Sequence, residues 1–423
     1  MAGPLEGIKV LEFTQIIAGP FGGMMLADMG ADVIKVEPVE GEPWRVALEF
    51  IPGESKTYMS LNRGKRSLPL DLTRPEAVEI IHKMIPGIDV VVINARPDVP
   101  NKLGIDYETL SSINPRIIYC DNTAFGRSGP DSYRPGYDLI IQAMSGLMAA
   151  EGKIRDGVPQ LITSTAVADF ATGIAIAWGV CAALFHRERT GRGQKVETTL
   201  LGTALGVQTG SFMEIDAFDA ERRAEFLAVL NAMRESGASY EEMHEQYVQI
   251  VSPWRGGNIY YRTYEASDGA LAVACLSDRL RKRVADVLGI GDPRFSPGFD
   301  PFDEETIAYS EKLVEKAEEL FRERTVQEWL DIFDGVGVPA GPVRYIQELL
   351  EDEQVEANGL SVELEHTLAG KVKMVGPIIG MSETPLEATS ASPALGEHTD
   401  EILMSMGYGQ EEISGMKTDG ITR

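Results

Sequence analysis

The stretch at residues 163–200, TSTAVADFATGIAIAWGVCAALFHRERTGRGQKVETTL, decides how the rest of the chain is organised. Its centre, residues 170–185, holds sixteen residues without a charge. A membrane-spanning helix needs roughly 20 apolar residues, so we predict a helix buried in a soluble core. Basic residues at its end, followed by Gly191 and Gly193, are typical helix stop signals. Residues 195–200 are predicted to form a strand.

One carboxylate, Asp169, stands directly before this apolar run. It has two possible roles. Aspartate is a favoured helix N-cap, and losing such a cap costs about 1 kcal/mol. Alternatively, N–H groups at a helix start stabilise negative charge on a reacting carbonyl, and a carboxylate shielded there can act as a covalent nucleophile. Taken alone, the residues favour the cap, because caps of this kind are common.

Length and charge limit the classes of protein that fit. A chain of 423 residues exceeds one typical core, which predicts two domains. The hydrophobic content of 43% excludes long disorder. The net charge of −26 argues against nucleic acid or an anionic membrane as the main partner. An anionic ligand would therefore need a local cluster of lysine and arginine.

The cysteines and the start of the sequence indicate the compartment. Cys120, Cys181 and Cys275 lie far apart, without metal or disulfide spacing. They are expected to be buried thiols in a reducing compartment. The opening residues, MAGPLEGIKV, lack a basic segment followed by a long apolar run, so no secretion signal is expected. We expect a cytoplasmic protein.

The first residues predict a βαβ unit. Residues 8–13 and 31–37 read as strands, and residues 18–30 read as the helix between them, which implies a parallel sheet. Glu37 stands about where a dinucleotide fold places its ribose-binding acid. The glycines lack G-x-G-x-x-G spacing, so close helix–sheet packing is favoured over a nicotinamide site.

More strands and helices alternate along the next hundred residues. Strands are predicted at 67–72, 89–94 and 116–121, with helices at 76–84 and 107–113 between them. This order predicts a Rossmann-like parallel sheet in an α/β domain. Ligands bind beyond the carboxyl ends of such strands. Basic residues gather at predicted strand ends, and either phosphate recognition or a solvated surface explains them equally well; they are Arg63, Lys65, Arg66, Arg74, Arg96 and Lys102.

The second half of the chain differs in character. The predicted organisation is a large α/β domain at 1–211, a linker at 212–224, a smaller α+β domain at 225–345 and a return segment at 346–423 that goes back to the large domain. The predicted elements are a β-hairpin at 258–264 and 270–275, helices at 279–288, 304–333 and 344–353, and strands near 362 and 372–375.

Eight segments in order resemble the family III CoA-transferases, which include formyl-CoA, carnitine and bile-acid CoA-transferases. They are LEFTQIIAGPFGGMMLADMGADVIKVEP, LNRGKRSLPLDL, FGRSGP, PGYDLIIQAMSGL, ADFATG, RTGRGQKVETTL, VGVPAGPV and LGEHTDEIL. The resemblance covers essentially the whole chain. In that family an aspartate at the place of Asp169 is the covalent nucleophile, so the resemblance favours catalysis over capping.

The resemblance also implies a coenzyme A site, with acyl-CoA as a substrate and no metal or permanently bound cofactor. Its residues would be Ile17, Ala18, Leu70, Thr73, Arg74, Asn94, Ala95, Arg96, Lys102, Arg134, Tyr137 and Asp138. Three positions depart from the family. Pro38 replaces an arginine, whose contacts Arg45 would share, and Ile17 replaces a glutamine. A glycine-rich flap is absent, and residues 254–258 would take its place, which makes oxalate an unlikely acceptor.

The reaction implied by the resemblance moves CoA from an acyl-CoA to a small carboxylic acid. Asp169 would attack the thioester to form an aspartyl–acyl anhydride, and CoA thiolate would then convert it to an aspartyl-CoA thioester. The acceptor acid would reverse these steps. Water must be excluded because it would hydrolyse each intermediate. The family also implies an interlocked homodimer.

Three other functions compete with CoA transfer as explanations of this sequence. An acyl-CoA racemase of the same superfamily uses a histidine where this chain has Tyr137, and a tyrosine with a pKa of about 10 is a poor base at neutral pH. A nicotinamide-binding oxidoreductase would need the missing glycine spacing. A non-enzymatic scaffold would require Asp169 to be only a cap.

Overall fold

The computed structural model describes residues 3–162, 165–251, 257–300 and 303–423. The chain forms two compact units. The large unit comprises Met1–Phe218 and Asp352–Arg423, and the second unit comprises Asp219–Glu351. The first boundary falls inside helix α11 (Asp216–Glu235), within the predicted linker at 212–224.

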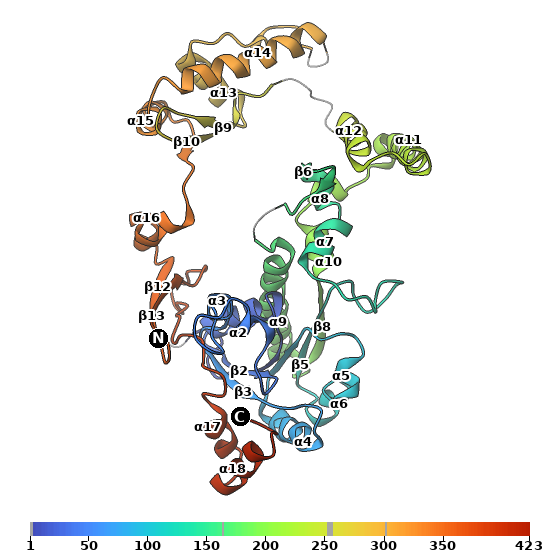
Figure 1. Ribbon diagram of the computed structural model, residues 1–423, viewed down its shortest axis with the longest axis vertical. Coiled ribbons are helices and arrows are strands. Elements are labelled where there is room, and N and C mark those ends of the chain that lie inside the picture. The colour runs from blue at the N-terminus through green and yellow to red at the C-terminus, as the bar shows by residue number, and fades with distance from the viewer. Residues whose placement is uncertain (1–2, 163–164, 252–256, 301–302) are drawn as a thin grey trace. The chain divides into compact units, whose positions relative to one another are not determined.

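A six-stranded parallel sheet forms the centre of the large unit (Figure 1). The strand order is β3-β2-β1-β4-β5-β8, and every neighbouring pair is parallel. The predicted Rossmann-like α/β fold is confirmed. The strands are β1 (Lys9–Phe13), β2 (Asp32–Glu37), β3 (Lys65–Pro69), β4 (Val90–Ile93), β5 (Ile118–Thr123) and β8 (Gln194–Thr199).

Helices cover both faces of this sheet, as buried strands with apolar residues on both sides require. On one face α1 (Ala18–Asp28) and α9 (Val167–Thr190) pack against β1, β4 and β5. On the other face lie α4 (Pro75–Met84), α6 (Tyr107–Ile113), α17 (Thr399–Ser405) and α18 (Gln410–Thr418). Short elements complete this unit: α2 (Pro43–Val46), α3 (Lys56–Asn62), α5 (Val99–Lys102), α7 (Asp138–Met144), α8 (Leu147–Glu151), α10 (Leu200–Gly206), β6 (Ile154–Arg155) and β7 (Val158–Pro159).

Helix α9 is longer than its apolar centre suggested. It has 24 residues and ends as predicted at Gly191, whose φ of 72° caps it. By length and composition alone this helix could cross a membrane, so the prediction that it is too short to do so was wrong. Half of its most apolar stretch is buried inside the protein, and the core helix of a soluble protein can have the same length and composition. Its burial against α1 and the sheet agrees with the core role.

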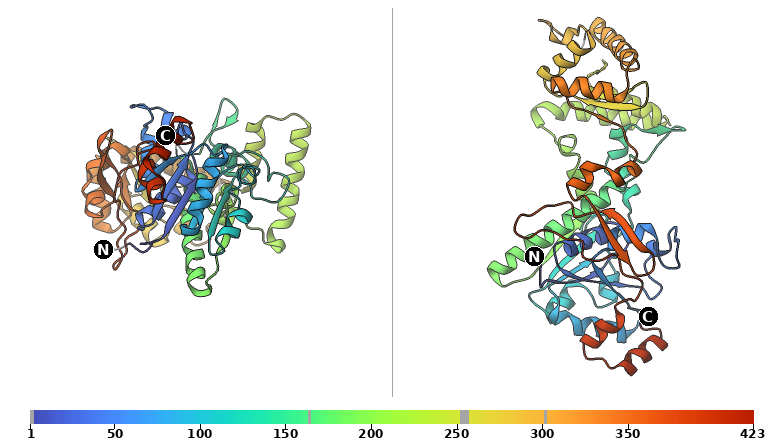
Figure 2. Two further views of the ribbon diagram at one scale, coloured as in Figure 1. Left: turned by 90° about the horizontal axis from the view of Figure 1, so that it is seen from below. Right: turned by 90° about the vertical axis from the view of Figure 1, so that its left-hand side faces the viewer.

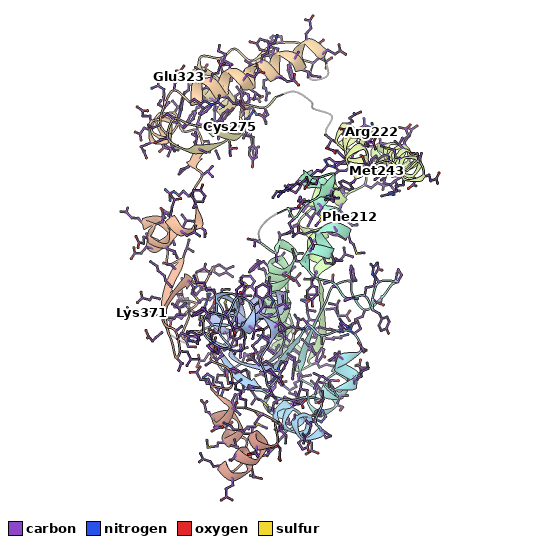
Figure 3. The ribbon with its side chains drawn as sticks, in the orientation of Figure 1. Phe212, Arg222, Met243, Cys275, Glu323 and Lys371 are labelled. Carbon is purple, nitrogen blue, oxygen red and sulfur yellow. The ribbon has the colours of Figure 1, made fainter. Side chains whose placement is uncertain are left out.

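The second unit combines a small antiparallel sheet with helices. The predicted hairpin is present as β9 (Tyr261–Glu265) and β10 (Ala270–Ala274), and β11 (Ala340–Pro342) extends it. Helix α13 (Asp278–Leu288) packs against this sheet, and α12 (Tyr240–Val251) precedes the sheet in the chain. Cys275, which Figure 3 labels, is buried in the core of this unit. In the same core the ring of Phe321 stacks on that of Tyr264.

The single helix predicted at 304–333 is wrong. The structure has two helices, α14 (Glu304–Phe321) and α15 (Val326–Val336). Thr325 and Glu328 form a capping box that starts α15, and this reciprocal pair satisfies free N–H groups at a new helix start. The predicted helix at 344–353 is instead a 3-10 turn (Ile346–Glu351) followed by α16 (Glu353–Ala357).

The segment after residue 351 packs on the large unit (Figure 2). Its hairpin, β12 (Ser361–His366) and β13 (Gly370–Val375), receives a hydrogen bond from Arg63 to the Val375 carbonyl at 2.6 Å. Farther on, the Thr422 hydroxyl donates to the Pro69 carbonyl at 2.6 Å. The edge strand β3 is therefore covered by residues distant in sequence.

Candidate active site

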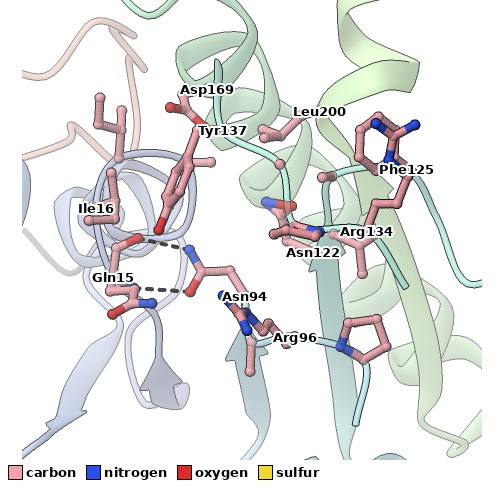
Figure 4. A pocket seen from close by; sticks show the side chains of 18 of the residues that line it. Gln15, Ile16, Asn94, Arg96, Asn122, Phe125, Arg134, Tyr137, Asp169 and Leu200 are labelled. Carbon is pink, nitrogen blue, oxygen red and sulfur yellow. Dashed lines mark hydrogen bonds between the residues drawn. The ribbon is translucent and has the colours of Figure 1, made fainter. Parts of the chain in front are cut away.

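A cavity of about 130 Å³ contains Asp169 at the carboxyl ends of the sheet strands (Figure 4). Its walls come from the carboxyl ends of three strands: residues 15–18 after β1, 94–97 after β4, and 122–125 at the end of β5 and just beyond it. Residues 132, 134–137 and 200 close it. The position agrees with the general rule that ligands bind beyond the carboxyl ends of parallel strands.

A second, larger cavity of about 530 Å³ is lined by Gln15, Asn94 and Ala95, which also line the first. It is lined besides by residues 36–40 after β2 and 70–73 after β3. The two cavities together offer a small reaction chamber next to a larger apolar hollow. Such a pair suits a ligand with a reactive end and a long body.

The residues predicted to bind coenzyme A divide among these surfaces. Ile17, Ala18, Asn94, Ala95, Arg96, Arg134 and Tyr137 line the cavity with Asp169. Leu70 and Thr73 line the larger cavity with Asn94 and Ala95. Lys102 lines neither; it borders an adjoining open hollow with Thr73. Arg74 lies outside these linings and contacts Glu76 at 3.6 Å.

Asp169 does not cap helix α9. The helix begins at Val167 after Ala166, so Asp169 is its third residue. The cap comes from Asp138, whose Oδ1 accepts hydrogen bonds from the N–H groups of Ala168 at 2.8 Å and Asp169 at 3.4 Å. The cap interpretation of Asp169 is therefore wrong. Sequence reasoning missed Asp138 as the cap because the two residues are 31 positions apart.

Asp138 is itself held in place by Gln142. The Gln142 amide donates to Asp138 Oδ2, and its Oε1 accepts from the Ile162 N–H at 3.1 Å. Asp138 is 7% exposed, so its carboxylate faces the start of α9 rather than solvent. A negative charge at a helix start is favourable with the helix dipole.

The Asp169 carboxylate is buried without a compensating partner. Its residue is 7% exposed, and in the described part of the chain no hydrogen bond or ion pair reaches its carboxylate oxygens. Burial, together with the smaller effect of the negative charge of Asp138, raises the pKa of Asp169 to about 7. A buried acid with such a raised pKa in a cavity is typical of a catalytic group.

The arginine and lysine cluster at 62–66 has another role than the two predicted for it. It spans the turn into β3 and the first residues of that strand. Two of its side chains point inward: Arg63 pairs with Asp28 at 2.6 Å and Lys65 with Glu12 at 2.9 Å. Both are almost fully buried. Phosphate recognition and a solvated surface are therefore both wrong for these two residues.

Arg45 is likewise unavailable to a ligand. It is completely buried and pairs with Glu37 at 2.8 Å and Glu54 at 3.0 Å. It therefore does not take over contacts of the arginine that Pro38 replaces. Glu37 is occupied by the same pair and by the Ser67 hydroxyl at 3.0 Å, which leaves it no free oxygen for a ribose.

The cations that remain near the cavities are Arg96 and Arg134, outside helices and strands, and Lys102, the last residue of α5. Arg134 pairs with Asp131 at 2.9 Å, and Lys102 pairs with Asp98. Arg96 lines the cavity with Asp169. Of the flap predicted at 254–258, residues 254–256 lie outside the described residues. Within the described ranges no group of three or more His, Cys, Asp or Glu side chains is placed to hold a metal ion.

Comparison with known proteins gives the family. The model of CoA-transferase family III matches residues 5–399, and the chain belongs to this family. Succinate–glutarate CoA-transferase of Agrobacterium fabrum is 34% identical over 95% of this chain and 96% of its own length. Formyl-CoA:oxalate CoA-transferase of Rhodopseudomonas palustris is 30% identical over 99% of this chain and 97% of its own.

A solved structure supports the same assignment. A CaiB/BaiF family protein from Brucella suis is 32% identical, with a TM-score of 0.73, covering 96% of this chain and 100% of that chain. The chain is a CoA-transferase, as the resemblance implied.

Proposed function

We propose that this protein transfers CoA from an acyl-CoA to a small carboxylic acid, with Asp169 as the covalent nucleophile. The observation that carries the proposal is the buried Asp169 carboxylate, which lines a cavity without a partner among the described residues. A carboxylate held in this way keeps its lone pairs available for attack. Helix α9 behind it limits the access of water.

Asp169 is the only protein group that forms covalent intermediates in the proposed reaction. Its oxygen attacks the thioester carbonyl, the carbon–sulfur bond breaks, and CoA leaves as thiolate from an aspartyl–acyl anhydride. The thiolate attacks the Asp169 side-chain carbonyl, which releases the donor acid and leaves an aspartyl-CoA thioester. The acceptor carboxylate then attacks that thioester, which expels the thiolate and forms a second aspartyl–acyl anhydride. The thiolate attacks the acyl carbonyl of this anhydride, so that the new acyl-CoA forms and Asp169 leaves as a free carboxylate.

The raised pKa of Asp169 has a role in this scheme. A carboxylate that is poorly solvated is a stronger nucleophile, and it must lose its proton before it attacks. With a pKa of about 7, the group is about half ionised at neutral pH. Only this ionised fraction can attack the donor thioester.

We propose short dicarboxylic acids as the acids exchanged. The support is the printed activity of the Agrobacterium fabrum relative, which names succinate and glutarate. Arg96 borders the cavity of Asp169, and a guanidinium binds a carboxylate bidentately. The second carboxylate of such an acid would have this cation within the same chamber.

We also propose a homodimer. Ile174, Trp178 and Phe185 are large apolar side chains on α9 and are 47%, 73% and 65% exposed. Exposed apolar groups of this size commonly mark a protein–protein contact. Sedimentation at micromolar concentration should give a mass near twice 46.2 kDa, and a stable monomer would contradict the proposal.

The direct test supplies substrates and reads products. The protein is incubated with succinyl-CoA together with one acceptor acid at a time: glutarate, oxalate, acetate or formate. New CoA esters are then identified by mass spectrometry. We expect glutaryl-CoA in the largest amount, in proportion to enzyme and absent without it. Hydrolysis of succinyl-CoA with no new CoA ester from any acid would refute the transferase proposal.

A further inference from the structure

The loop after β1 contains a residue in an unfavourable backbone conformation. Ile16 has a φ of 72°, and a β-branched residue in this region is a steric outlier. Such residues persist only where surrounding contacts hold them, and they gather at functional sites. Ile16 lines the cavity of Asp169, so its strain lies at the reaction chamber.

Two side chains hold the backbone of this loop. The Ile16 N–H donates to Glu42 Oε2 at 2.8 Å. One residue earlier, the Gln15 N–H donates to Asn94 Oδ1 at 3.0 Å, and the Asn94 amide donates to the Gln15 carbonyl at 2.8 Å (Figure 4). Asn94 fixes residue 15, whereas Glu42 is the group that fixes the left-handed residue itself.

Buried neighbours hold Glu42 in place at the edge of the larger cavity. It is 1% exposed, and its own N–H donates to Glu37 Oε2 at 3.2 Å. Lys35 Nζ lies 3.1 Å from Glu42 Oε1 and also donates to the Thr14 carbonyl at 2.8 Å. Lys35 therefore contacts both Glu42, which holds Ile16, and the backbone of Thr14, two residues before Ile16.

The conformation of Ile16 sets the direction of the helix that follows. The Ile17 carbonyl accepts the first hydrogen bond of α1, from the Phe21 N–H at 2.8 Å. Ile17 gives α1 no side-chain cap, so the N–H groups of Ala18 and Gly19 are left without one, while Pro20, the third residue of the helix, has no N–H. Ile17 and Ala18 line the cavity together with Asp169.

We propose that Glu42 is a positioning residue that holds Ile16 left-handed and thereby aims the first N–H groups of α1 at the carbonyl attacked by Asp169. Glu42 also lines the larger cavity, so the KM for acyl-CoA of its variants separates a direct contact with CoA from an action through the loop. N–H groups placed in advance at a developing oxyanion stabilise it without reorganisation. The inference rests on the proposed function, because the oxyanion arises in the Asp169 reaction.

The test separates positioning from general stability by rescue. In Glu42→Ala the loop loses its acceptor, and kcat for CoA transfer should fall at least about tenfold while KM for acyl-CoA stays within about twofold. Ile16→Gly added to Glu42→Ala should recover most of kcat, since glycine adopts positive φ without side-chain strain. Glu42→Gln keeps an acceptor oxygen and should retain more activity than Glu42→Ala.

A matched control is Glu54→Gln, which changes another buried acid that pairs with Arg45 and makes no contact with the loop. Its kcat should remain near that of the wild type. Equal losses in Glu54→Gln and Glu42→Ala, or no recovery by Ile16→Gly, would overturn the positioning role. If Glu42→Ala does not fold, a kcat for Glu42→Gln far below that of Glu54→Gln would overturn it, because glutamine keeps an oxygen that can accept the Ile16 N–H.

Amide hydrogen exchange makes the result independent of activity. In Glu42→Ala the peptide containing residues 15–18 should exchange faster than in the wild type, and in Glu54→Gln it should not. Unchanged exchange in Glu42→Ala would refute the role of Glu42 even in an active enzyme. Absence of CoA transfer by the wild type would instead refute the proposed function, so the two failures remain distinct.

Discussion

Two buried carboxylates of the large unit, Glu12 and Asp169, differ in how their charge is compensated. Glu12 is completely buried and lies 2.9 Å from Lys65 and 3.2 Å from Lys35, while the Thr14 hydroxyl donates to it at 2.7 Å. The carboxylate of Asp169, also buried, has no such partner among the described residues. A buried carboxylate that is paired with cations, as Glu12 is, stabilises the fold, whereas an unpaired one, as Asp169 is, stays available to react.

The largest expected effect comes from neutralising the isolated acid. In Asp169→Asn, CoA transfer should fall by about 10³-fold or more, because the amide cannot form the anhydride. The melting temperature should change little, since Asp138 supplies the cap of α9. The wild type given acyl-CoA should carry a hydroxylamine-labile CoA adduct on the peptide with Asp169. Near-normal turnover by a variant verified free of deamidation would sink the mechanism.

The next effect tests the paired acid. Lys65→Met removes one partner of Glu12 and leaves excess buried negative charge, which should lower the free energy of unfolding by about 3–5 kcal/mol. Adding Glu12→Met removes both members of the pair and should recover part of this loss. Urea unfolding measures both variants. A double variant less stable than Lys65→Met alone would show that Glu12 stabilises the fold through its other contacts.

A third prediction concerns the charge that Asp138 places beside Asp169. Because Asp169 must be ionised, kcat/KM should rise with pH through about 7. Asp138→Asn keeps an oxygen that can accept the Ala168 N–H but removes the charge, so the midpoint should move to lower pH. An unchanged midpoint, measured from pH 5 to 9, would count against this assignment.

The same shift has a consequence for stability. The pKa of Asp169 is higher in the folded protein than its usual value of 3.8, so between these values the folded state binds more protons than the unfolded state. The contribution of this group to the free energy of unfolding therefore falls as pH rises from about 4 to about 7. Asp169→Asn should remove that slope.

The smallest expected effect belongs to a surface cation. Lys102 is 70% exposed and pairs with Asp98, so Lys102→Ala should raise KM for acyl-CoA only a few-fold and leave kcat unchanged. Lys371→Ala is the matched control, because it removes another exposed lysine that pairs with a carboxylate, Glu363. A fall in kcat with unchanged KM would contradict a role in binding CoA phosphates.

The strands of the large unit were predictable because their apolar runs are continuous and each is bounded by turns. Residues 90–93, for example, are all buried valine or isoleucine, which is the pattern of a strand covered on both faces. Helix breaks were harder. The turn at Thr325 interrupts an amphipathic run, and a capping pair inside such a run gives only a weak signal.

The candidate site was predictable only in part. Asp169 stood out because one charge precedes an apolar helix, but its environment depends on Asp138 through long-range hydrogen bonds that no spacing rule predicts. The left-handed Ile16 gave no signal either, since isoleucine disfavours that conformation. Arg45 was expected to share contacts with coenzyme A, but its buried partners Glu37 and Glu54 are brought together only by the fold.

The covering of β3 by residues after 351 has a consequence for the order of events during synthesis. Arg45 donates to the Pro393 carbonyl and Thr422 to the Pro69 carbonyl, over separations of 348 and 353 positions. Gly420 also lines the larger cavity. While the chain is still on the ribosome, the edge of β3 stays uncovered until these late residues have been synthesised. A pause or truncation near residue 400 would therefore leave an exposed strand edge, which is prone to aggregate.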